Sequence, residues 1–223
     1  MNNLESYVFG LLVTDGTIYF AKERNRGKVI LEISEKDKDI VEKLHKLYPE
    51  SHIRVRTRST NFSPNYTSYS FVNGMLSFRT WLVNSGFPRT NKTMLASIPT
   101  VDFSPVDFWR GVIDGDGSIG FTKKNIPFVG LVTKSENLKT EFLKFLKLEF
   151  GIEKISARNK RDNIYNICLL NEAAVDVSRL LYIENSPELY LDRKYNNAVE
   201  LQSWVRTVED RSYRSSYKER RKF

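Results

Sequence analysis

One sequence pattern occurs twice: residues 7–16 read YVFGLLVTDG, and residues 108–117 read FWRGVIDGDG. Each stretch is mostly apolar, has a glycine at its fourth position and closes with Asp-Gly. The pattern predicts two buried helices that end at Asp15 and Asp116. A helix C-terminus carries about half a negative charge, so a carboxylate is disfavoured there. The same disfavoured residue in both copies indicates that a cation binds at these ends.

The two stretches belong to a longer internal repeat. Asp15 and Asp116 lie 101 positions apart. With one extra residue, Lys92 aligns with Lys194. The 101-residue offset also aligns two serines that are natural helix N-caps, and one apolar helix face. The aligned residues are Ser34 with Ser135, and Val41, Leu44 and Leu47 with Phe142, Phe145 and Leu148.

The repeat predicts two similar halves, residues 1–98 and 105–203, with a short linker at 99–104 and a basic tail at 204–223. Each half is expected to have the order αββαββα, which is an α+β unit with an antiparallel sheet. A proline and a cap at Ser104 mark the start of the second motif helix. The expected strands are residues 17–21, 28–33, 52–58 and 67–72, then 118–122, 128–133, 154–158 and 163–169.

The charge of the chain favours a polyanionic partner. In its 223 residues, 35 lysines and arginines outnumber 27 acids, which gives a net charge of +8. Such a balance fits nucleic acid or an acidic membrane surface. No apolar run reaches the roughly 20 residues of a membrane span. The start shows no signal-peptide pattern, so an intracellular, non-secreted protein is expected.

The rare residue types exclude several kinds of site. Cys168 is the single cysteine, so no intrachain disulfide can form, and its apolar neighbours predict that it is buried. His45 and His52 are the only histidines. A zinc finger, a histidine–metal nuclease and a Ser-His-Asp triad are therefore poorly supported.

The glycines suggest how the two helix ends come together. A glycine inside a helix costs about 1 kcal/mol relative to alanine, and is tolerated where something must approach the backbone closely. If the motif helices pack at Gly10 and Gly111, then Asp15 and Asp116 face each other. Two carboxylates about 5 Å apart repel by about 3 kcal/mol at an effective dielectric near 20. Ligation by oxygen alone suits Mg²⁺, and paired carboxylates with Mg²⁺ in a basic protein indicate phosphodiester hydrolysis.

A simpler interpretation is that Asp-Gly only forms a turn after a helix, which is common. For a single copy that interpretation would be preferred. Two copies at matched positions, each with a glycine inside a buried helix, favour a shared site instead.

Both stretches resemble the motif of the LAGLIDADG homing endonucleases, in the form that carries two motifs in one chain. The second copy is near the family pattern, whereas the first has Val13 where the family often has an acid. The matching αββαββα order extends the resemblance over both halves. It implies a saddle-shaped monomer, packed through its two motif helices, whose antiparallel sheets bind a long, partly pseudo-palindromic double-stranded DNA target.

The resemblance also implies roles for individual residues. Asp15 and Asp116 would hold Mg²⁺, for which Mn²⁺ would substitute, with help from the carbonyls of Thr14 and Gly115. Each acid would serve one strand, so that cleavage across the minor groove leaves short 3′ overhangs. Lys92 and Lys194 match the family's basic residues and would stabilise the phosphate or orient water. Asp114, whose counterpart is Val13, is expected to have no partner.

The basic residues of the predicted strands and hairpins form the expected DNA-binding surface. Arginines at alternate positions of residues 54–58 point to one face of a strand. Some basic side chains would neutralise phosphates and others would read guanine edges. The full set is Lys22, Arg24, Arg26, Lys28, Arg54, Arg56, Arg58, Lys123, Lys124, Lys134, Arg158, Lys160 and Arg161.

The leading hypothesis is a Mg²⁺-dependent, sequence-specific endodeoxyribonuclease. One alternative is an RNA maturase that assists splicing, for which intron RNA is the partner. The other is a DNA-binding regulator without catalysis. Retention of both acids and both lysines argues against the regulator, but it does not separate a nuclease from a maturase.

Overall fold

The computed structural model describes residues 1–21, 26–59, 64–184 and 186–206. The first half contains α1 (Asn3–Asp15), β1 (Gly16–Phe20), β2 (Gly27–Ser34), α2 (Lys38–Leu47), β3 (His52–Arg58), β4 (Tyr66–Asn73), α3 (Leu76–Asn84) and the short α4 (Lys92–Leu95). The second half contains α5 (Pro105–Asp116), β5 (Gly117–Phe121), β6 (Pro127–Thr133), α6 (Glu136–Phe150), β7 (Tyr165–Leu170), α7 (Glu172–Tyr182) and α8 (Asp192–Leu201).

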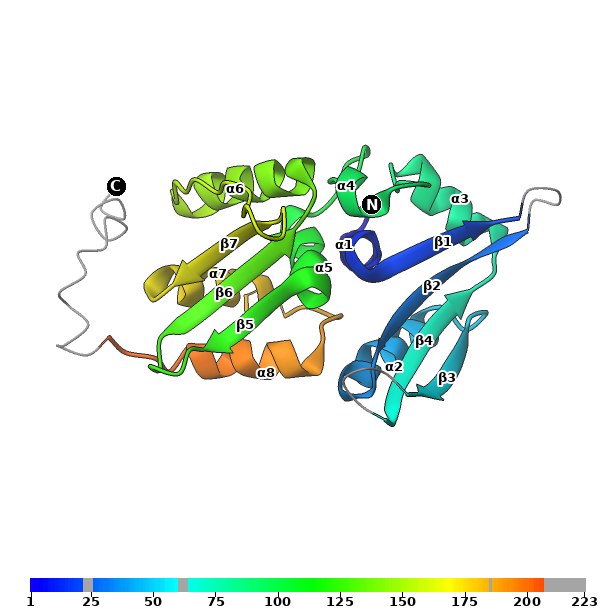
Figure 1. The fold of residues 1–223 in the computed structure, drawn as a ribbon, viewed down its shortest axis with the longest axis horizontal. Coiled ribbons are helices and arrows are strands. Elements are labelled where there is room, and N and C mark those ends of the chain that lie inside the picture. The colour runs from blue at the N-terminus through cyan, green and yellow to red at the C-terminus, as the bar shows by residue number, and fades with distance from the viewer. Residues whose placement is uncertain (22–25, 60–63, 185, 207–223) are drawn as a thin grey trace.

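The sheets are antiparallel and lie side by side on one face of the molecule (Figure 1). The first has the order β1-β2-β4-β3 and packs against α2 and α3. The second has the order β5-β6-β7 and packs against α5, α6 and α7. The predicted fold class, an α+β protein with two repeated halves and antiparallel sheets, is confirmed.

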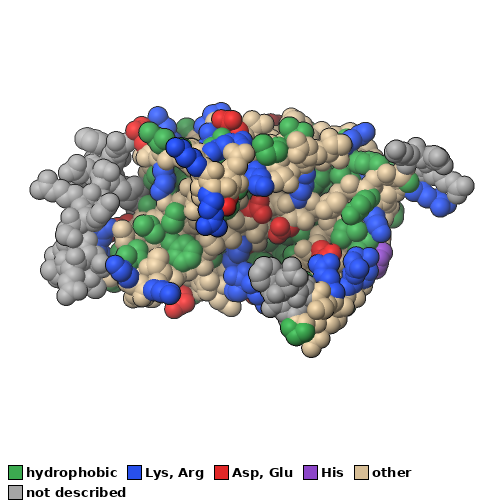
Figure 2. Space-filling view, in the orientation of Figure 1, with side chains coloured by type: hydrophobic (Ala, Val, Ile, Leu, Met, Phe, Trp, Pro, Cys, Tyr) green, Lys and Arg blue, Asp and Glu red, His purple; other side chains and the backbone are tan. Residues whose placement is uncertain are grey.

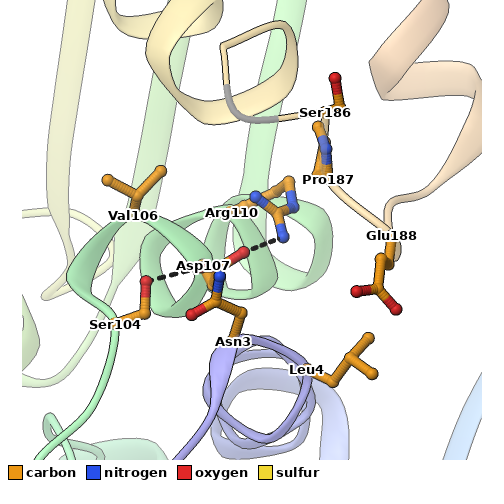
Figure 3. A pocket seen from close by; sticks show the side chains of 9 residues that line it. All are labelled: Asn3, Leu4, Ser104, Val106, Asp107, Arg110, Ser186, Pro187 and Glu188. Atoms are coloured by element: carbon orange, nitrogen blue, oxygen red, sulfur yellow. Dashed lines mark hydrogen bonds and ion pairs between the residues drawn. The ribbon is translucent and has the colours of Figure 1, made fainter.

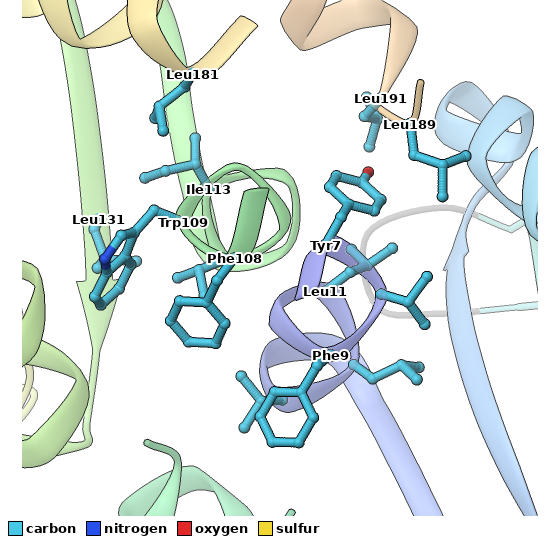
Figure 4. Close-up of a cluster of buried hydrophobic side chains, with 14 of the residues drawn as sticks. Tyr7, Phe9, Leu11, Phe108, Trp109, Ile113, Leu131, Leu181, Leu189 and Leu191 are labelled. Atoms are coloured by element: carbon cyan, nitrogen blue, oxygen red, sulfur yellow. The ribbon is translucent and has the colours of Figure 1, made fainter. Parts of the chain in front are cut away.

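The motif helices α1 and α5 join the two halves through backbone contact. A Cβ atom on Gly10 would lie 2.2 Å from the carbonyl oxygen of Phe108, and one on Gly111 would lie 2.2 Å from that of Tyr7. Only glycine permits so close an approach. Side chains of both helices, such as Phe9 and Phe108, belong to one continuous buried cluster (Figure 4). The predicted packing of the halves through the motif helices is therefore confirmed.

The Gly111→Ala variant tests this contact. The added methyl group must push the helices apart, and overpacking of this kind costs about 1–3 kcal/mol, more than the helix propensity that alanine gains. Urea unfolding should show a loss of about 2 kcal/mol. Gly74→Ala is the matched control, because a Cβ there meets nothing within 4 Å. Equal stabilities of the two variants would contradict the packing argument.

The second sheet lacks one expected strand. Residues 154–158 form no strand, and only an isolated bridge joins Arg158 to Tyr165. This segment instead runs beside β7 through side-chain bonds, from Lys154 Nζ to the carbonyl of Cys168 and from Ser156 Oγ to the carbonyl of Asn166. Its one large apolar residue, Ile155, is 96% exposed. With no apolar face to bury, the segment does not extend the sheet.

Several smaller expectations were wrong. Ser135 caps α6 through the backbone N–H of Leu138, but Ser34 makes no side-chain cap bond to the backbone. Ser104 does occupy the predicted N-cap position of α5, directly before Pro105, although its side chain bonds to Asp107 instead of the backbone. The 3₁₀ turn at Glu35–Asp37 separates Ser34 from α2, which removes it from the capping position.

The predicted apolar helix faces end one turn early. The first two residues of each triplet are buried, but Leu47 and Leu148 are 36% and 83% exposed. Cys168 is only half-buried, because it lies on the strand face opposite the buried Ile167 and Leu169.

The linker, residues 99–104, contains no helix or strand. Of the predicted tail, residues 207–223 lie outside the described residues. None of the described helices is long and apolar enough to cross a membrane.

Candidate active site and nucleic-acid interface

The C-terminal ends of α1 and α5 meet, and each helix leads directly into the first strand of its own sheet. Asp15 and Asp116 are the last residues of the two helices, and both are exposed to solvent. A Cβ atom on Gly115 would lie 2.0 Å from Thr14 Oγ1 and 3.4 Å from Asp15 Oδ2. The last turn of α1 therefore rests on the last turn of α5. The repeat brings the two acids to the same end of the helix pair.

The two carboxylates share one electrostatic environment. Desolvation, followed by the charge of Asp15, raises the pKa of Asp116 to about 6. Neighbouring atoms partly desolvate the Asp15 carboxylate and raise its pKa as well, although the residue is exposed to water. The charge of Asp37 adds to this rise. The charges of Lys92 and Lys194 oppose both shifts. Added positive charge here would favour the ionised acids.

The oxygen ligands at the C-terminal ends of the two motif helices fit Mg²⁺. They are the carboxylates of Asp15 and Asp116 and the carbonyl oxygens of the preceding residues. In the described ranges, no group of three or more His, Cys, Asp or Glu side chains could hold a metal. Zinc is usually held by such a group, whereas Mg²⁺ is commonly bound by one or two carboxylates and keeps several waters. The carbonyl of Thr14 already accepts a bond from Lys92, so the carbonyl of Gly115 is the better candidate ligand.

The two aligned lysines cap the C-termini of the two motif helices. Lys194 Nζ donates to the carbonyls of Ile113, Asp114 and Gly117 at 2.5, 2.7 and 2.9 Å. Lys92 Nζ donates to the carbonyl of Thr14. A cation at these carbonyls offsets the negative end of the helix dipole. The structure thus brings both predicted lysines to the acids, but in unequal surroundings.

Asp114 is not without a partner, contrary to expectation. It is 4% exposed, and its Oδ1 accepts from the Tyr182 hydroxyl at 2.6 Å. Its Oδ2 accepts from the Tyr7 hydroxyl at 2.7 Å and from the backbone N–H of Leu191 at 2.9 Å. Burial raises the pKa of this carboxyl, while Lys194 and the three donors lower it. Asp114 therefore ties α1, α7 and the start of α8 to α5.

One signal in the sequence could have revealed this network. The 101-residue offset pairs Asp114 with Val13, and it pairs Tyr7 with Phe108. At both positions one copy is polar where the other is apolar. An acid and a tyrosine that each align with an apolar residue in the other copy are candidates for a hydrogen bond between the halves.

A hollow of about 290 Å³ opens beside Asp15, between the halves. Its lining includes Glu32, Asp37 and Arg193. The Arg193 guanidinium holds both oxygens of Asp37, at 2.8 and 3.0 Å, and Lys43 pairs with Asp192 at 2.5 Å. These ion pairs were not predicted from the sequence. They join α8 to α2 and to the 3₁₀ turn at Glu35–Asp37 that precedes α2.

A smaller hollow of about 150 Å³ lies at the opposite ends of the motif helices (Figure 3). Asp107 there accepts from Arg110 and Ser104, so its carboxylate is already engaged. At 1.5 Å per residue, the helices place this hollow about 18 Å from Asp15 and Asp116. It therefore takes no part in the candidate active site.

The open face of the first sheet is basic. Strand alternation and the pairing of Arg54 with Ser70 and Arg56 with Ser68 place the three arginines of β3 opposite the core face. Lys28 of β2 lies on the same face. Arg58 pairs with Glu32 at 3.3 Å. In Figure 2, acidic side chains gather near the middle of the view with lysines and arginines around them.

The second half carries its charge at the edges. The open face of its sheet holds uncharged residues, namely Ser118, Gly120, Phe128, Gly130, Val132, Asn166, Cys168 and Leu170. Five of the predicted basic residues are exposed in the turns and loops around it, namely Lys123, Lys124, Lys134, Lys160 and Arg161.

Arg158 does not extend freely toward a partner. Its guanidinium donates to the Tyr165 hydroxyl, to Asn163 and to the carbonyl of Lys134. These bonds hold the guanidinium within the loop, so it is not available to contact a partner. Arg26 is exposed beside β2, while Lys22 and Arg24 lie outside the described residues.

Comparisons with known proteins identify structures of the same fold. Residues 105–187 match the family described as the LAGLIDADG-like domain. The structure resembles that of the homing endonuclease I-WcaI bound to its DNA recognition sequence, with a TM-score of 0.63 and 14% identity over 86% of this chain and 85% of that one. It also resembles I-GzeII in complex with its DNA target, with a TM-score of 0.57 and 12% identity over 96% and 94% of the two chains.

A third similar structure is the meganuclease I-AabMI bound to uncleaved DNA, with a TM-score of 0.54 and 10% identity over 87% of each chain. No curated protein sequence matches the chain. The family match thus lies within the second half of the chain, over residues 105–187. The chain as a whole has the fold of the two-domain LAGLIDADG homing endonucleases, which confirms the resemblance drawn from its motifs.

Proposed function

We propose that this protein is a monomeric, site-specific DNA endonuclease that hydrolyses one phosphodiester in each strand. The observation that carries the proposal is the convergence of Asp15 and Asp116 at the ends of two helices in backbone contact. The basic face of the first sheet supports a duplex DNA partner, since phosphate neutralisation dominates DNA affinity. The resemblance further suggests cleavage across the minor groove with short 3′ overhangs.

The residues around the acids have separable tasks. Asp15 and Asp116, with the carbonyl of Gly115, would hold Mg²⁺ or Mn²⁺. A bound divalent ion would supply an activated water and neutralise charge on the leaving oxygen. The lysines and the helix contact hold the acids in place, because each acid is fixed at a capped helix end. Arginines of β3 and Lys28 would orient the duplex through phosphates and base edges.

The proposal is tested by cleavage of DNA selected for binding. A randomised duplex library is incubated with the protein in Ca²⁺, and bound duplexes are recovered and sequenced. One recovered duplex is then incubated with the protein in Mg²⁺, and both ends of the product are mapped. We expect breaks in both strands at one position, with 3′ overhangs. Intact duplex at saturating protein in Mg²⁺ and in Mn²⁺ would refute the nuclease.

The same experiment separates the alternatives. Tight, selective binding without any break would favour the DNA-binding regulator. Failure to select any duplex, together with faster splicing of an intron transcript on addition of protein, would favour the maturase.

A further inference from the structure

We infer that two ion pairs fix the angle between the two halves, and thereby the spacing of the two DNA half-sites that the protein accepts. The pairs are Asp37 with Arg193 and Lys43 with Asp192, and they are called the inter-half ion pairs below. They join α8 to α2 and to the 3₁₀ turn before α2. The inference rests on the proposed binding of duplex DNA, and it adds a determinant of specificity that lies outside the faces of the sheets.

The inter-half ion pairs have the geometry of strong contacts. Arg193 Nε and Nη2 donate to the two oxygens of Asp37 at 2.8 and 3.0 Å, and the Asp37 side chain is only 13% exposed. Lys43 Nζ donates to Asp192 at 2.5 Å and to the carbonyl of Tyr190 at 2.7 Å. A bidentate arginine–carboxylate pair fixes direction as well as distance, and partial burial reduces its screening by salt. These contacts therefore hold α8 in one orientation on the first half.

The position of these pairs restricts rotation of the halves. The motif helices α1 and α5 meet at Gly10 and Gly111, and packed helices can slide by small amounts against each other. In Figure 1, α2 and α8 lie to one side of this helix pair, and α4 and α6 lie to the other. A contact away from the helix axes resists rotation through a longer lever arm than a contact at the axes. The inter-half ion pairs are placed to provide that resistance.

The matching contact on the other side of the helix pair is of a different kind. The repeat aligns α2 with α6, and the start of α8 with α4. There the Ser135 hydroxyl donates to the carbonyl of Ala96, and both residues are buried. One side of the interface is thus uncharged and buried, whereas the other depends on charges that are partly exposed to water. Loss of a charge on that side should let the halves rotate about the buried side while each half stays folded.

The angle between the halves matters because each half carries its own sheet. The two sheets lie side by side, and each would hold one half-site of the DNA (Figure 1). In B-DNA, one additional base pair moves the next half-site by about 3.4 Å and turns it by about 35°. Halves held at a fixed angle cannot follow such a change. We therefore expect wild-type protein to reject altered spacing, and protein without the inter-half ion pairs to accept it at a lower cost.

The test compares the duplex recovered by selection with versions that have one base pair inserted or removed at the centre of the region that the protein protects. Affinity is measured in Ca²⁺, and the spacing penalty is the ratio of the dissociation constants for altered and original duplex. Asp37→Asn and Arg193→Gln change the net charge in opposite directions, so they should shift general DNA affinity in opposite directions. Both should nevertheless lower the spacing penalty by about fivefold, as for loss of one partly buried ion pair.

Two further proteins make this test specific. The exchanged pair, Asp37→Arg with Arg193→Asp, should restore the spacing penalty, because it restores the attraction between the same two positions. Glu141→Gln and Lys144→Gln are the matched controls, since they break an ion pair within α6 and make the same two changes of net charge. Neither control should alter the spacing penalty.

A second measurement needs no DNA. In Cys168→Ser protein, spin labels are attached at Tyr19→Cys and Leu148→Cys, which are exposed positions in the first and second halves. The distribution of label-to-label distances should be narrow while the inter-half ion pairs are intact, and broader in Arg193→Gln. This measurement reports the angle between the halves whatever the protein binds.

An unchanged spacing penalty in either single variant would overturn the inference. A distance distribution that does not broaden would do so as well, and so would an exchanged pair that leaves the penalty low. If the wild-type protein binds selected duplexes but never cuts them, the proposed nuclease fails while the spacing test still applies. If it selects no duplex at all, the proposed function fails and the spacing role fails with it, whereas the distance distribution still decides whether the ion pairs fix the angle.

Discussion

The Asp116→Asn variant is expected to lose double-strand cleavage while DNA binding is retained. Asparagine keeps the size of the side chain but removes the charge that would hold a divalent ion. A bound ion contributes several kcal/mol of transition-state stabilisation, and each 1.36 kcal/mol is tenfold in rate, so the loss should be about 10³-fold or more. Asp15→Asn is expected to behave alike, because the two acids occupy matching helix ends.

The measurement is the single-turnover rate of each strand in Mg²⁺, with affinity determined in Ca²⁺. Removal of a negative charge near phosphates should leave affinity equal or slightly higher. Asp102→Asn is the matched control, since this acid is exposed and lies in the linker. Double-strand cleavage at the control rate by either variant would show that the paired acids do not hold the catalytic ion.

The second large effect is expected on stability. In Asp114→Val, which makes the second motif like the first, three buried donors lose their acceptor: the hydroxyls of Tyr7 and Tyr182 and the N–H of Leu191. Each unsatisfied buried group costs about 1–3 kcal/mol. We expect the free energy of unfolding to fall by at least about 4 kcal/mol in total, which is a large part of the stability of a typical domain.

Urea unfolding of Asp114→Val beside Asp102→Val measures this loss. The single change Tyr7→Phe removes one of the three bonds and should cost about 1–2 kcal/mol. A loss below about 1 kcal/mol in Asp114→Val would mean that water or other groups replace the carboxylate, and the network would not be what holds α7 and α8 to α5.

The repeat could be predicted because its signals are local. Apolar periodicity, a glycine inside each motif helix and the Asp-Gly ending are all contained in ten residues, and the copy at residues 108–117 repeats them. From these signals followed the order of elements in the first half and the packing of the two motif helices at Gly10 and Gly111. The expected strand at residues 154–158 did not form, because repeat position alone does not supply an apolar face to bury.

Only the tertiary structure determined which partner each polar group has. Asp114 receives its hydrogen bonds from residues 107, 68 and 77 positions away, and no local pattern indicates such contacts. The same holds for the lysines, which are equivalent in the repeat and unequal in space. By itself the sequence determined that two acids end two packed helices. Distant segments determine how deeply each of the two lysines is buried and how many carbonyl oxygens it contacts, so only the tertiary structure shows how the two lysines differ.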